Sequence, residues 1–475
     1  MGQSDNPFSL QHWLGRVDPR PLALFRIGLG LVLLEDLLLW SADFKAFLTD
    51  DGILPVAARP AEWHAGLFQF VTTPAAAGAL YALGILAALA FTLGFRTRIA
   101  SVACWAFFVS LHTRNRELIL GGDDLAGVFL FWAIFANCGA CWSIDARRLP
   151  TRPTAAFGMR LLQFVPALIY LHAARFKLLL GGSGWLHGNT LYQTMQLHGW
   201  IRPPGEWLRH QPQLCAFLGD GVIIMEFAFP LLLLMPVWST QARKLAIPLN
   251  LAVQLGIMTT MKVGIFTDLM LASTLLYLPS SWIDAVLAKL GRLRAPFTLE
   301  PYEGTSAWQR PSPLRLASMG LLLAEYTIMA ALPAAWRHIP QPLAETVRHL
   351  GLDLKVDLYS HGYAVQAWGS RALDARGRPV DAIGVVAPGL RNDSGWRFSR
   401  WTSLVGRQGI HFNELGDYLC RTYQERTGTP LGSISIWSEG HDAPVPGEPT
   451  PPMWKKPLAE LSCRNPSTPE LTAAP

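Results

Sequence analysis

The sequence has little charge for its length, since Asp, Glu, Lys and Arg make up only 16% of its 475 residues. An ordinary soluble protein is about one quarter charged, so this composition disfavours a soluble fold. The chain also lacks a dense basic block, which argues against nucleic-acid binding despite a net charge of +6. The first 20 residues are polar and lack a cleavable signal peptide, so we expect the first apolar segment to stay in the mature protein.

Cysteine is scarce as well. The six cysteines are Cys104, Cys138, Cys141, Cys215, Cys420 and Cys463. The first four lie in or beside apolar segments and the last two stand alone, so the sequence predicts no disulfide framework. Cys138 and Cys141 form a C-x-x-C motif, but no second pair completes a zinc site. The motif is interpreted as a reduced thiol pair or a coincidence, and no metal is predicted.

The abundant residues are apolar ones, which form 51% of the chain. They are concentrated in runs of about 20, the length that crosses a bilayer as a helix. The pattern predicts an all-α polytopic membrane protein with about nine transmembrane helices, followed by a small extracytoplasmic β-rich (α+β) module. The nine predicted spans begin near Pro21, Ala75, Ile99, Asp124, Phe157, Leu214, Lys244, Phe266 and Leu316.

Basic residues cluster in alternate connections between the predicted spans, which the positive-inside rule places in the cytoplasm. They are Arg16, Arg20, Arg96, Arg98, Arg147, Arg148, Arg152, Arg243, Lys244, Arg292 and Arg294. The predicted topology is therefore multi-pass, with the N-terminus cytoplasmic and the C-terminal module outside.

The chain divides into three predicted parts. Residues 1–340 form the transmembrane domain and residues 341–445 the α+β module, with strands at 354–360, 363–370 and 432–438 and a helix at 413–425. Residues 446–475 are Pro-rich and are predicted to be disordered. His361, His411 and Asp393 match no metal motif and are interpreted as surface residues.

Ionisable residues mark the span over residues 157–188, whose outer half contains His172, Arg175 and Lys177. Such groups at membrane depth cost several kcal/mol unless they are paired or reach water. A buried amine can act as a base near neutral pH, which makes Lys177 a candidate proton abstractor. The alternative is that Arg175 and Lys177 extend to the interface from a helix end.

Other polar residues also fall within predicted spans. They are Arg26, Glu35, Asp36, Glu226, Gln254, Asp268 and Glu325. Each is expected to face the bundle interior and find a partner, with Arg26 paired to one of the carboxylates.

The segment HTRNRELILGGDD (112–124) is predicted to be an outer loop. Asn115 and Arg116 supply donors that could hold an oxyanion or a polar headgroup. The alternative is a simple turn in which Asp123 and Asp124 cap the following helix.

A series of motifs follows in order along residues 18–280. They are DPRPLALFRIGLG, DGILP, LGFRTRIAS, HTRNRELILGGDD, IYLHAARFKL with a later GW, MEFAFPLLL and GIFTDLMLAS. In this order the chain resembles the HTTM family, the membrane domain shared with vitamin K-dependent gamma-carboxylase.

The resemblance implies a chemistry. In the carboxylase, a lysine matched here by Lys177 deprotonates a reduced vitamin K hydroquinone, and oxygen converts the quinol to an epoxide through a strong alkoxide base. That base removes a proton from a glutamate side chain, to which carbon dioxide adds. A reduced quinone, with O2 and CO2 as co-substrates, is thus expected, in a carboxylase-like carbon–carbon lyase or quinol oxygenase-type reaction. His172, Arg175, Trp185 and Gln254 are the expected cofactor-binding residues.

The chain departs from the carboxylase pattern at two places. An Asn-His pair reads Asn115-Arg116 here, and a histidine expected in the seventh span is Gln254, which donates hydrogen bonds but shuttles no proton at neutral pH. The short C-terminal module, like that of bacterial relatives, replaces a large lumenal domain, and a bacterial inner membrane is the expected location.

Two other functions compete with the enzyme. The first is a non-carboxylating membrane factor for maturation or export of a secreted peptide, whose cavity binds lipid or peptide. The second, a small-solute transporter, is less favoured because no paired helix interruptions occur in two repeated halves. The expected partners are the lipid bilayer and a secreted peptide or protein.

Overall fold

The structure is a computed structural model, and its description covers most of the helical region and the C-terminal sheet. The described residues are 10–59, 66–71, 73–148, 150–180, 185, 189–197, 200–233, 235, 238–291, 320, 340, 342, 345–346, 349–352, 365–387, 411–442 and 444–463.

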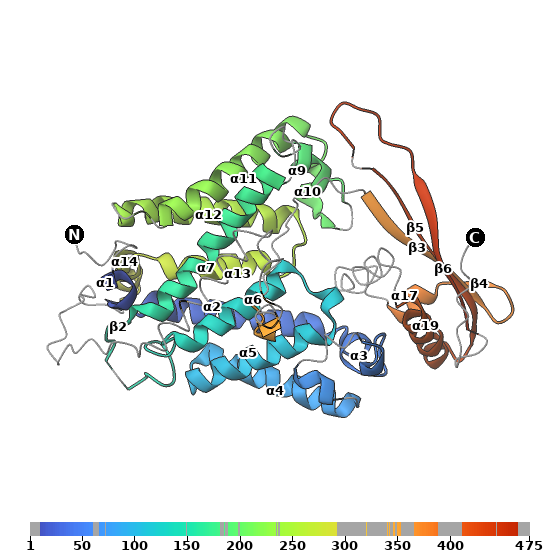
Figure 1. The fold of residues 1–475 in the computed structure, drawn as a ribbon, viewed down its shortest axis with the longest axis horizontal. Coiled ribbons are helices and arrows are strands. Elements are labelled where there is room, and N and C mark those ends of the chain that lie inside the picture. The colour runs from blue at the N-terminus through green and yellow to red at the C-terminus, as the bar shows by residue number, and fades with distance from the viewer. Residues whose placement is uncertain are drawn as a thin grey trace.

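Residues 10–291 form a bundle of helices of unequal length. The longer ones are α2 (Arg20–Ser41), α4 (Pro74–Leu93), α5 (Thr97–Arg114), α6 (Gly121–Phe135), α7 (Ala156–Arg175), α11 (Pro212–Leu233) and α12 (Ser239–Thr260). Shorter helices are α1 (Leu10–Leu14), α3 (Phe44–Leu48), α9 (Asn189–Thr194), α10 (Pro203–Leu208), α13 (Phe266–Thr274) and α14 (Ser280–Lys289). Helices α1 and α14 lie at one end of the bundle, and the C-terminal sheet lies at the other (Figure 1).

The local sequence determines where helix α4 begins and ends. Helix α4 begins with Pro74 in its first turn, and the Thr73 side chain accepts a hydrogen bond from the Ala76 N–H at 3.3 Å. It ends at Gly94, whose φ of +68° is a left-handed conformation that glycine adopts without strain. A Cβ at Gly94 would lie 2.3 Å from the Ser143 Cβ, so the following loop also requires glycine there.

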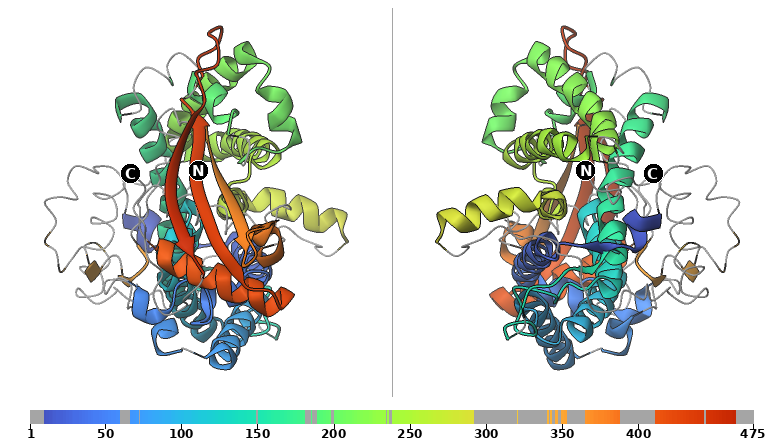
Figure 2. Two further views of the ribbon diagram at one scale, coloured as in Figure 1. Left: turned by 90° about the vertical axis from the view of Figure 1, so that its right-hand side faces the viewer. Right: turned by 90° about the vertical axis from the view of Figure 1, so that its left-hand side faces the viewer.

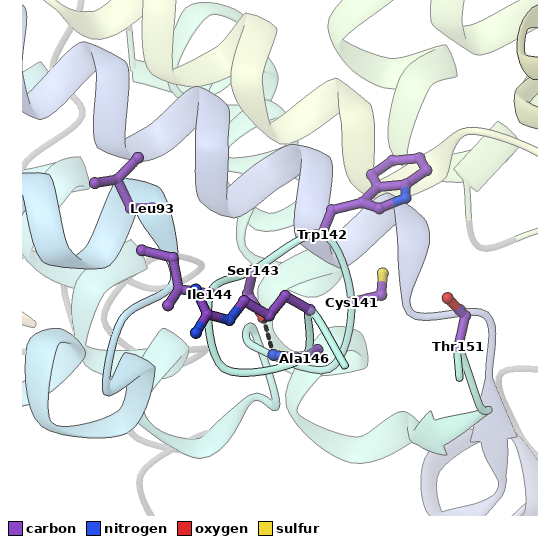
Figure 3. Close-up of a pocket in the computed structure, with 8 residues that line it drawn as sticks. Leu93, Cys141, Trp142, Ser143, Ile144, Ala146 and Thr151 are labelled. Carbon is purple, nitrogen blue, oxygen red and sulfur yellow. Dashed lines mark hydrogen bonds between the residues drawn. The ribbon is translucent and has the colours of Figure 1, made fainter. Parts of the chain in front are cut away.

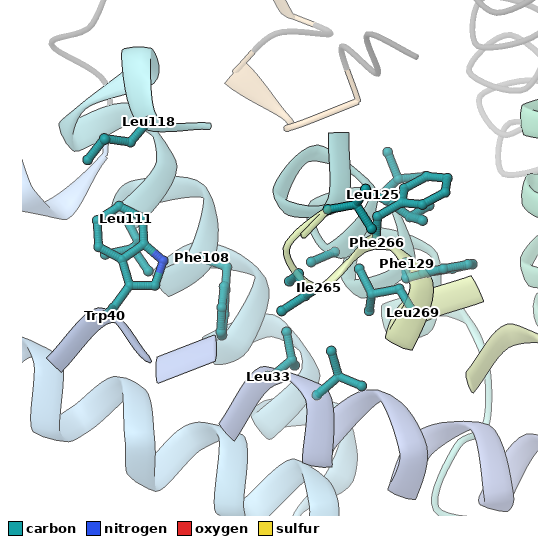
Figure 4. Close-up of a cluster of buried hydrophobic side chains, with 14 of the residues drawn as sticks. Leu33, Trp40, Phe108, Leu111, Leu118, Leu125, Phe129, Ile265, Phe266 and Leu269 are labelled. Atoms are coloured by element: carbon teal, nitrogen blue, oxygen red, sulfur yellow. The ribbon is translucent and has the colours of Figure 1, made fainter. Parts of the chain in front are cut away.

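The bundle core is built around α2. Leu33 and Trp40 of α2 pack among large apolar side chains of α5, α6 and α13, including Phe108, Phe129 and Leu269 (Figure 4). These five side chains are 0–1% exposed. Close packing of such large side chains stabilises the contacts between helices, so α2 is a central element of the helical domain.

The number of membrane-crossing helices is lower than predicted. In the described part of the chain, three helices are long and apolar enough to cross a membrane: Pro74–Leu93, Ala156–Leu178 and Pro212–Leu233. A fourth candidate is the pair Phe266–Tyr277 and Ser280–Lys289, which is bent by 95°. The prediction of nine spans is therefore not supported.

The other predicted spans form helices that differ from simple spans. Helix α2 carries Arg26, Glu35 and Asp36, while α6 has only 15 residues, about 22 Å of helix against a hydrocarbon core of about 30 Å. The ninth predicted span near Leu316, with Glu325, lies outside the described residues. The described part of the chain is thus mostly helical with three candidate membrane spans, and its other helices do not all match the bilayer thickness.

The C-terminal module contains an antiparallel sheet in the order β4-β3-β5-β6. Its strands are β3 (Val365–Asp374), β4 (Pro379–Val380), β5 (Leu431–His441) and β6 (Trp454–Ser462), and helices α17 (Ala382–Val386) and α19 (Phe412–Thr427) accompany them. Seen from the end, the sheet stands across the end of the bundle (Figure 2). The predicted helix at 413–425 and the strand at 432–438 are confirmed, as is most of the strand at 363–370. The strand expected at 354–360 lies outside the described residues.

Two predictions for this module are wrong. The segment 446–475, predicted to be disordered, contains β6, which pairs with β5 through Ile436 and Ala459. Cys420 of α19 and Cys463, which directly follows β6, form a disulfide, although the sequence predicted none. The bond ties α19 to the strand. Single cysteines 43 residues apart give no spacing signal, so only the fold reveals the pair.

The module contacts the bundle through α19. Arg421 donates to the backbone carbonyls of Asp51 and Gly52 at 2.8 and 3.4 Å. Lys45 of α3 forms an exposed ion pair with Glu425 at 3.2 Å. These contacts place α19 directly over the loop that follows α3.

Candidate functional site

Lys177 lies in a distorted turn at the end of α7. The helix ends at Arg175 and continues as a π-helical turn over Phe176–Leu180 (η6). Such turns are rare and occur frequently at functional sites. Lys177 is only 5% exposed, so its side chain lies inside the protein and does not extend to solvent.

Glu226 of α11 is the partner of Lys177. The Lys177 Nζ donates a short hydrogen bond to Glu226 Oε1, and the two groups form a buried ion pair. The Trp185 ring, 3% exposed, lies with its centroid 4.7 Å from the same nitrogen. A cation over an indole face is favourable, most of all away from water. The Lys177–Glu226 pair is thus shielded from bulk solvent.

The pairing defines what Lys177 can do chemically. A lysine acts as a base only in its neutral form, so it must first lose a proton. Glu226 is in direct contact and can accept that proton, which converts an ion pair into a neutral amine and a neutral acid. Burying charges in a low-dielectric interior is costly. The free energy of the ion pair is therefore closer to that of the neutral pair than it would be in water.

A chain of buried hydrogen bonds lies beside the pair and joins three helices. Gln254 Nε2 donates to the Tyr170 hydroxyl at 2.6 Å, and that hydroxyl donates to Asn250 Oδ1. Asn250 Nδ2 in turn donates to Thr274 Oγ1 at 2.6 Å. We call Tyr170, Gln254, Asn250 and Thr274 the Tyr170 network. It fixes α7, α12 and α13 relative to one another.

Two oxygen atoms at this site lack a donor among the described residues. They are Glu226 Oε2 and Gln254 Oε1, on side chains that are 6% and 1% exposed. Both residues are neighbours of Tyr170: Gln254 by a hydrogen bond and Glu226 through its charge. A buried acceptor without a donor is costly, so the site is suited to a ligand that supplies O–H or N–H groups.

The other expected cofactor-binding residues on α7 are His172 and Arg175, which precede Lys177 in the chain. His172 is buried, and its ring centroid lies 5.9 Å from that of Phe176. Arg175 is half-buried at the end of α7. Of the four expected cofactor residues, Trp185 contacts Lys177 and Gln254 belongs to the adjacent network.

The two remaining expected site residues, Asn115 and Arg116, lie directly after α5. Asn115 follows α5 and is fully buried, and among the described residues its side-chain amide has no hydrogen-bond partner. Arg116 begins a 3-10 turn, Arg116–Leu118. Within the described ranges, Lys177 forms no hydrogen bond or ion pair with either residue. The capping alternative is confirmed for Asp123, whose carboxylate accepts from the Leu120 N–H at 2.7 Å.

Two further predictions for interior charges are wrong. Arg26 forms no ion pair with a carboxylate of the described residues: it donates to the backbone carbonyls of Cys138 and Trp142 at 3.0 and 2.5 Å, and so holds the loop after α6. Glu35 is exposed and does not face the bundle interior. Asp36, Glu226 and Gln254 are buried as predicted.

The C-x-x-C motif forms neither a metal site nor a disulfide. Cys138 and Cys141 are free, buried thiols, and burial raises the pKa of both to about 12, so they are poor nucleophiles. No three His, Cys, Asp or Glu side chains of the described residues are arranged to hold a metal ion. His411 Nδ1 lies 3.8 Å from Glu414 Oε1. His361 and Asp393 are outside the described residues.

A hollow of about 450 Å³ lies next to this motif (Figure 3). Its lining includes Leu93, Cys141, Trp142 and Ile144. It opens at the end of the bundle where α7 begins, whereas Lys177 follows the other end of that 20-residue helix, roughly 30 Å away. The hollow therefore does not belong to the lysine site.

Sequence reasoning missed Tyr170, Asn250 and Thr274, and it did not pair Glu226 with Lys177. One signal was present: Tyr170 precedes Lys177 by seven residues, which places both on one face of a helix. The partners from α11, α12 and α13 follow from tertiary packing and leave no local pattern.

The chain matches the family model described as the HTTM domain over residues 15–282. This range covers more than half of the chain and contains the Lys177–Glu226 pair and the whole Tyr170 network. The comparisons with curated proteins and with solved structures find no match. The chain therefore belongs to the HTTM family.

Proposed function

We propose that this protein is a quinol-dependent membrane enzyme that modifies a secreted protein or peptide, with Lys177 as the catalytic base. The HTTM domain is related to vitamin K-dependent carboxylase-like membrane proteins, which supports the reaction class. The observation that carries the proposal is the buried Lys177–Glu226 pair beside two acceptor oxygens without donors. A base that is shielded from water and in contact with its own proton acceptor suits this chemistry.

The residues of the site fit a hydroquinone. Its hydroxyl groups are donors that match Glu226 Oε2 and Gln254 Oε1, and Trp185 offers a flat apolar surface near the ammonium group. When bound, a reduced quinone supplies an acidic O–H and two electrons for reaction with O2. In our proposal, Glu226 accepts the Lys177 proton, and the neutral amine then takes the ligand proton.

Gln254 acts as a positioning residue in this proposal. Its Nε2 is committed to Tyr170, which turns its carbonyl oxygen toward the ligand as an acceptor. Glutamine moves no proton at neutral pH, so proton transfer stays with Lys177 and Glu226.

Carbon dioxide would add to a glutamate carbanion of the substrate, as in a carboxylase-like carbon–carbon lyase.

We further propose that the α1 end of the bundle faces the cytoplasm of a bacterium and that the C-terminal module lies outside its inner membrane. Two observations support this orientation. The Cys420–Cys463 disulfide is typical of an oxidising compartment, and Cys138 and Cys141 at the other end are free thiols. Lys177 then lies in the outer half of the bundle, near the compartment of a secreted substrate.

Replacing Lys177 by arginine tests the proposal. Membranes that carry the full chain are stripped of quinones and supplied with a reduced naphthoquinone, and quinol loss and oxygen uptake are followed. Lys177→Arg keeps the charge but removes the base, because guanidinium is not deprotonated in proteins. We expect a loss of about 100-fold or more. Arg20→Lys is the control, since Arg20 forms a buried ion pair with Asp18 at the other end of the bundle.

Turnover by Lys177→Arg at the wild-type rate would overturn the role of Lys177 as base. If wild-type membranes consume no quinol, the quinol-dependent reaction itself is rejected. A secreted protein that gains the mass of one carbon dioxide per modified glutamate, only in cells with the wild-type chain, would identify the reaction as carboxylation.

One observation favours the alternative, a non-carboxylating factor for maturation or export of a secreted peptide. Lys177 is already paired with Glu226, which is also how a purely structural lysine would be accommodated. In that case, replacing both residues by apolar ones preserves export of the peptide, whereas the enzyme would lose its activity.

A further inference from the structure

A second buried polar cluster lies at the outer end of α5, apart from the lysine site. Arg114, the last residue of α5, is 0% exposed. Its guanidinium donates to the carbonyls of Leu54 and Thr49 at 2.7 and 3.0 Å and to Asp50 Oδ1 at 3.2 Å. Arg114 therefore holds the loop of residues 49–56 against the bundle.

Arg59 lies near Arg114, and its hydrogen-bonding groups are unused. It is 4% exposed, and no described residue accepts a hydrogen bond from its Nε, Nη1 or Nη2. The two arginines lie close enough to repel each other, and Asp50 is the carboxylate that attracts both. Asp50 Oδ1 is already shared between Arg114 and the Val56 N–H, which donates at 3.0 Å.

The charges of this cluster do not balance. Two guanidinium groups face one carboxylate, which leaves one positive charge in a buried place. Burial lowers the pKa of Arg59, and the attraction of Asp50 offsets this effect only in part. Buried N–H donors without a protein acceptor suit a bound polar ligand, and only an anion would also neutralise the charge.

We propose that Arg59 and Arg114 form a binding site for a phosphate group. The three unpartnered nitrogens of Arg59 hold its N–H donors in one rigid plane, a geometry that suits bidentate binding of phosphate oxygens. The group is either a free phosphate or the phosphodiester of an anionic lipid headgroup. The site is independent of the chemistry proposed for Lys177.

The surroundings of the loop support a role at the membrane surface. Arg421 of α19 donates to the carbonyls of Asp51 and Gly52, so the C-terminal module covers the same loop from outside. The loop follows α3 at the end of the bundle that carries the module (Figure 1). Lipid headgroups lie at such helix ends, whereas free phosphate would reach the loop from water.

The site can be tested with the full chain in a neutral detergent. Thermal unfolding is followed while sodium phosphate is titrated in one arm and phosphatidylglycerol in mixed micelles in the other, with phosphatidylcholine as the lipid control. We expect saturable stabilisation of the wild type in at least one arm. Stabilisation by phosphate alone identifies free phosphate, and stabilisation by phosphatidylglycerol alone identifies a lipid.

Variants then locate the binding. Arg59→Gln removes the unused charge and is expected to weaken binding by about tenfold or more, as for other hydrogen bonds to charged groups. Arg421→Gln changes the same charge on the outside of the same loop and should alter the affinity less than about twofold, because this exposed contact is weak. Arg59→Lys keeps the positive charge but lacks the planar guanidinium that binds phosphate in a bidentate manner. This variant tests the role of Arg59 if Arg59→Gln does not fold.

Three results would overturn the proposal. The first is a wild-type protein that neither ligand stabilises, which would leave Arg59 neutralised by another part of the chain, such as Glu62. The second is unchanged affinity in Arg59→Gln, or in Arg59→Lys if the glutamine variant does not fold. The third is equal stabilisation by phosphatidylcholine and phosphatidylglycerol with no response to phosphate.

Discussion

Removing Lys177 alone should destabilise the protein far more than removing the whole Lys177–Glu226 pair. Both side chains are under 10% exposed, and Glu226 Oε1 has Lys177 as its partner. In Lys177→Met the carboxylate must stay charged without a partner or take up a proton. With an ordinary glutamate pKa of about 4.3, protonation at pH 7 costs about 3.7 kcal/mol, which sets the expected loss at roughly 3–4 kcal/mol.

The double variant completes the test. In Glu226→Leu the ammonium group loses its partner, with an expected cost of about 3–5 kcal/mol. In the Lys177→Met/Glu226→Leu variant neither charge is buried, and replacing a buried pair by apolar side chains is often neutral or stabilising. The two single losses together amount to about 6–9 kcal/mol, whereas the double variant should lose close to none, so the coupling free energy should be roughly 6–9 kcal/mol, above the usual values for neighbouring residues.

The assay is denaturant unfolding of the detergent-solubilised chain, followed by tryptophan fluorescence, for the wild type and the three variants. The loss in Lys177→Met should also shrink by about 1.4 kcal/mol for each unit that the pH is lowered from 7 toward 5, because uptake of one proton becomes easier. If the losses of the two single variants simply add in the double variant, the two groups are not an energetic unit. The reasoning about the site would then be refuted.

Three further predictions concern other parts of the molecule. Replacing Cys420 and Cys463 by alanine removes a cross-link between residues 43 apart in the sequence. Loop entropy predicts that the module loses about 4 kcal/mol of stability, which should be measured as lower resistance to proteases. The backbone N–H of Arg378 donates to Asp374 and lowers the pKa of this carboxylate. The ionised carboxylate therefore stabilises the folded state above the ordinary aspartate pKa of about 3.9, and this stabilisation is lost as the pH falls below 3.9 toward the lowered pKa. Asp374→Asn should remove this part of the acid sensitivity in unfolding curves recorded from pH 2 to 6. Tyr170→Phe should weaken reduced-naphthoquinone binding by freeing Gln254, whereas Tyr277→Phe, which also loses one buried hydroxyl, should affect stability only.

The sequence predicted the helical elements better than their relation to the membrane. Apolar runs of helical length correctly placed α4, α7 and α11, because their composition alone satisfies the bilayer. Helix α2 has a similar length, yet Arg26 and Asp36 point into protein, where packing compensates for them. Hydropathy cannot separate a lipid-facing helix from a protein-facing one, so it overcounted the spans.

For the site, the sequence located the lysine but not its environment. Lys177 was singled out because a charge inside an apolar run requires compensation, and this argument needs no coordinates. Its partner could have been any interior carboxylate, and only the packing of α11 on α7 selects Glu226 over Asp36 or Asp268. For Asn115 the sequence offered only its place in a predicted outer loop, and no hydrogen bond among the described residues joins it to Lys177.

Stability alone gives a poor account of the Lys177–Glu226 pair. Two well-packed apolar side chains would hold α7 against α11 at least as firmly, because neither would have to be desolvated. The same holds for Glu226 Oε2 and Gln254 Oε1, which lack donors among the described residues and therefore cost free energy in the folded state. Buried acceptors without donors raise the free energy of the folded state, and a ligand that donates hydrogen bonds to them lowers it. This arrangement therefore favours ligand binding. A ligand that brings both a donor and a removable proton compensates for both costs at once, and this favours a hydroquinone over an acyl chain.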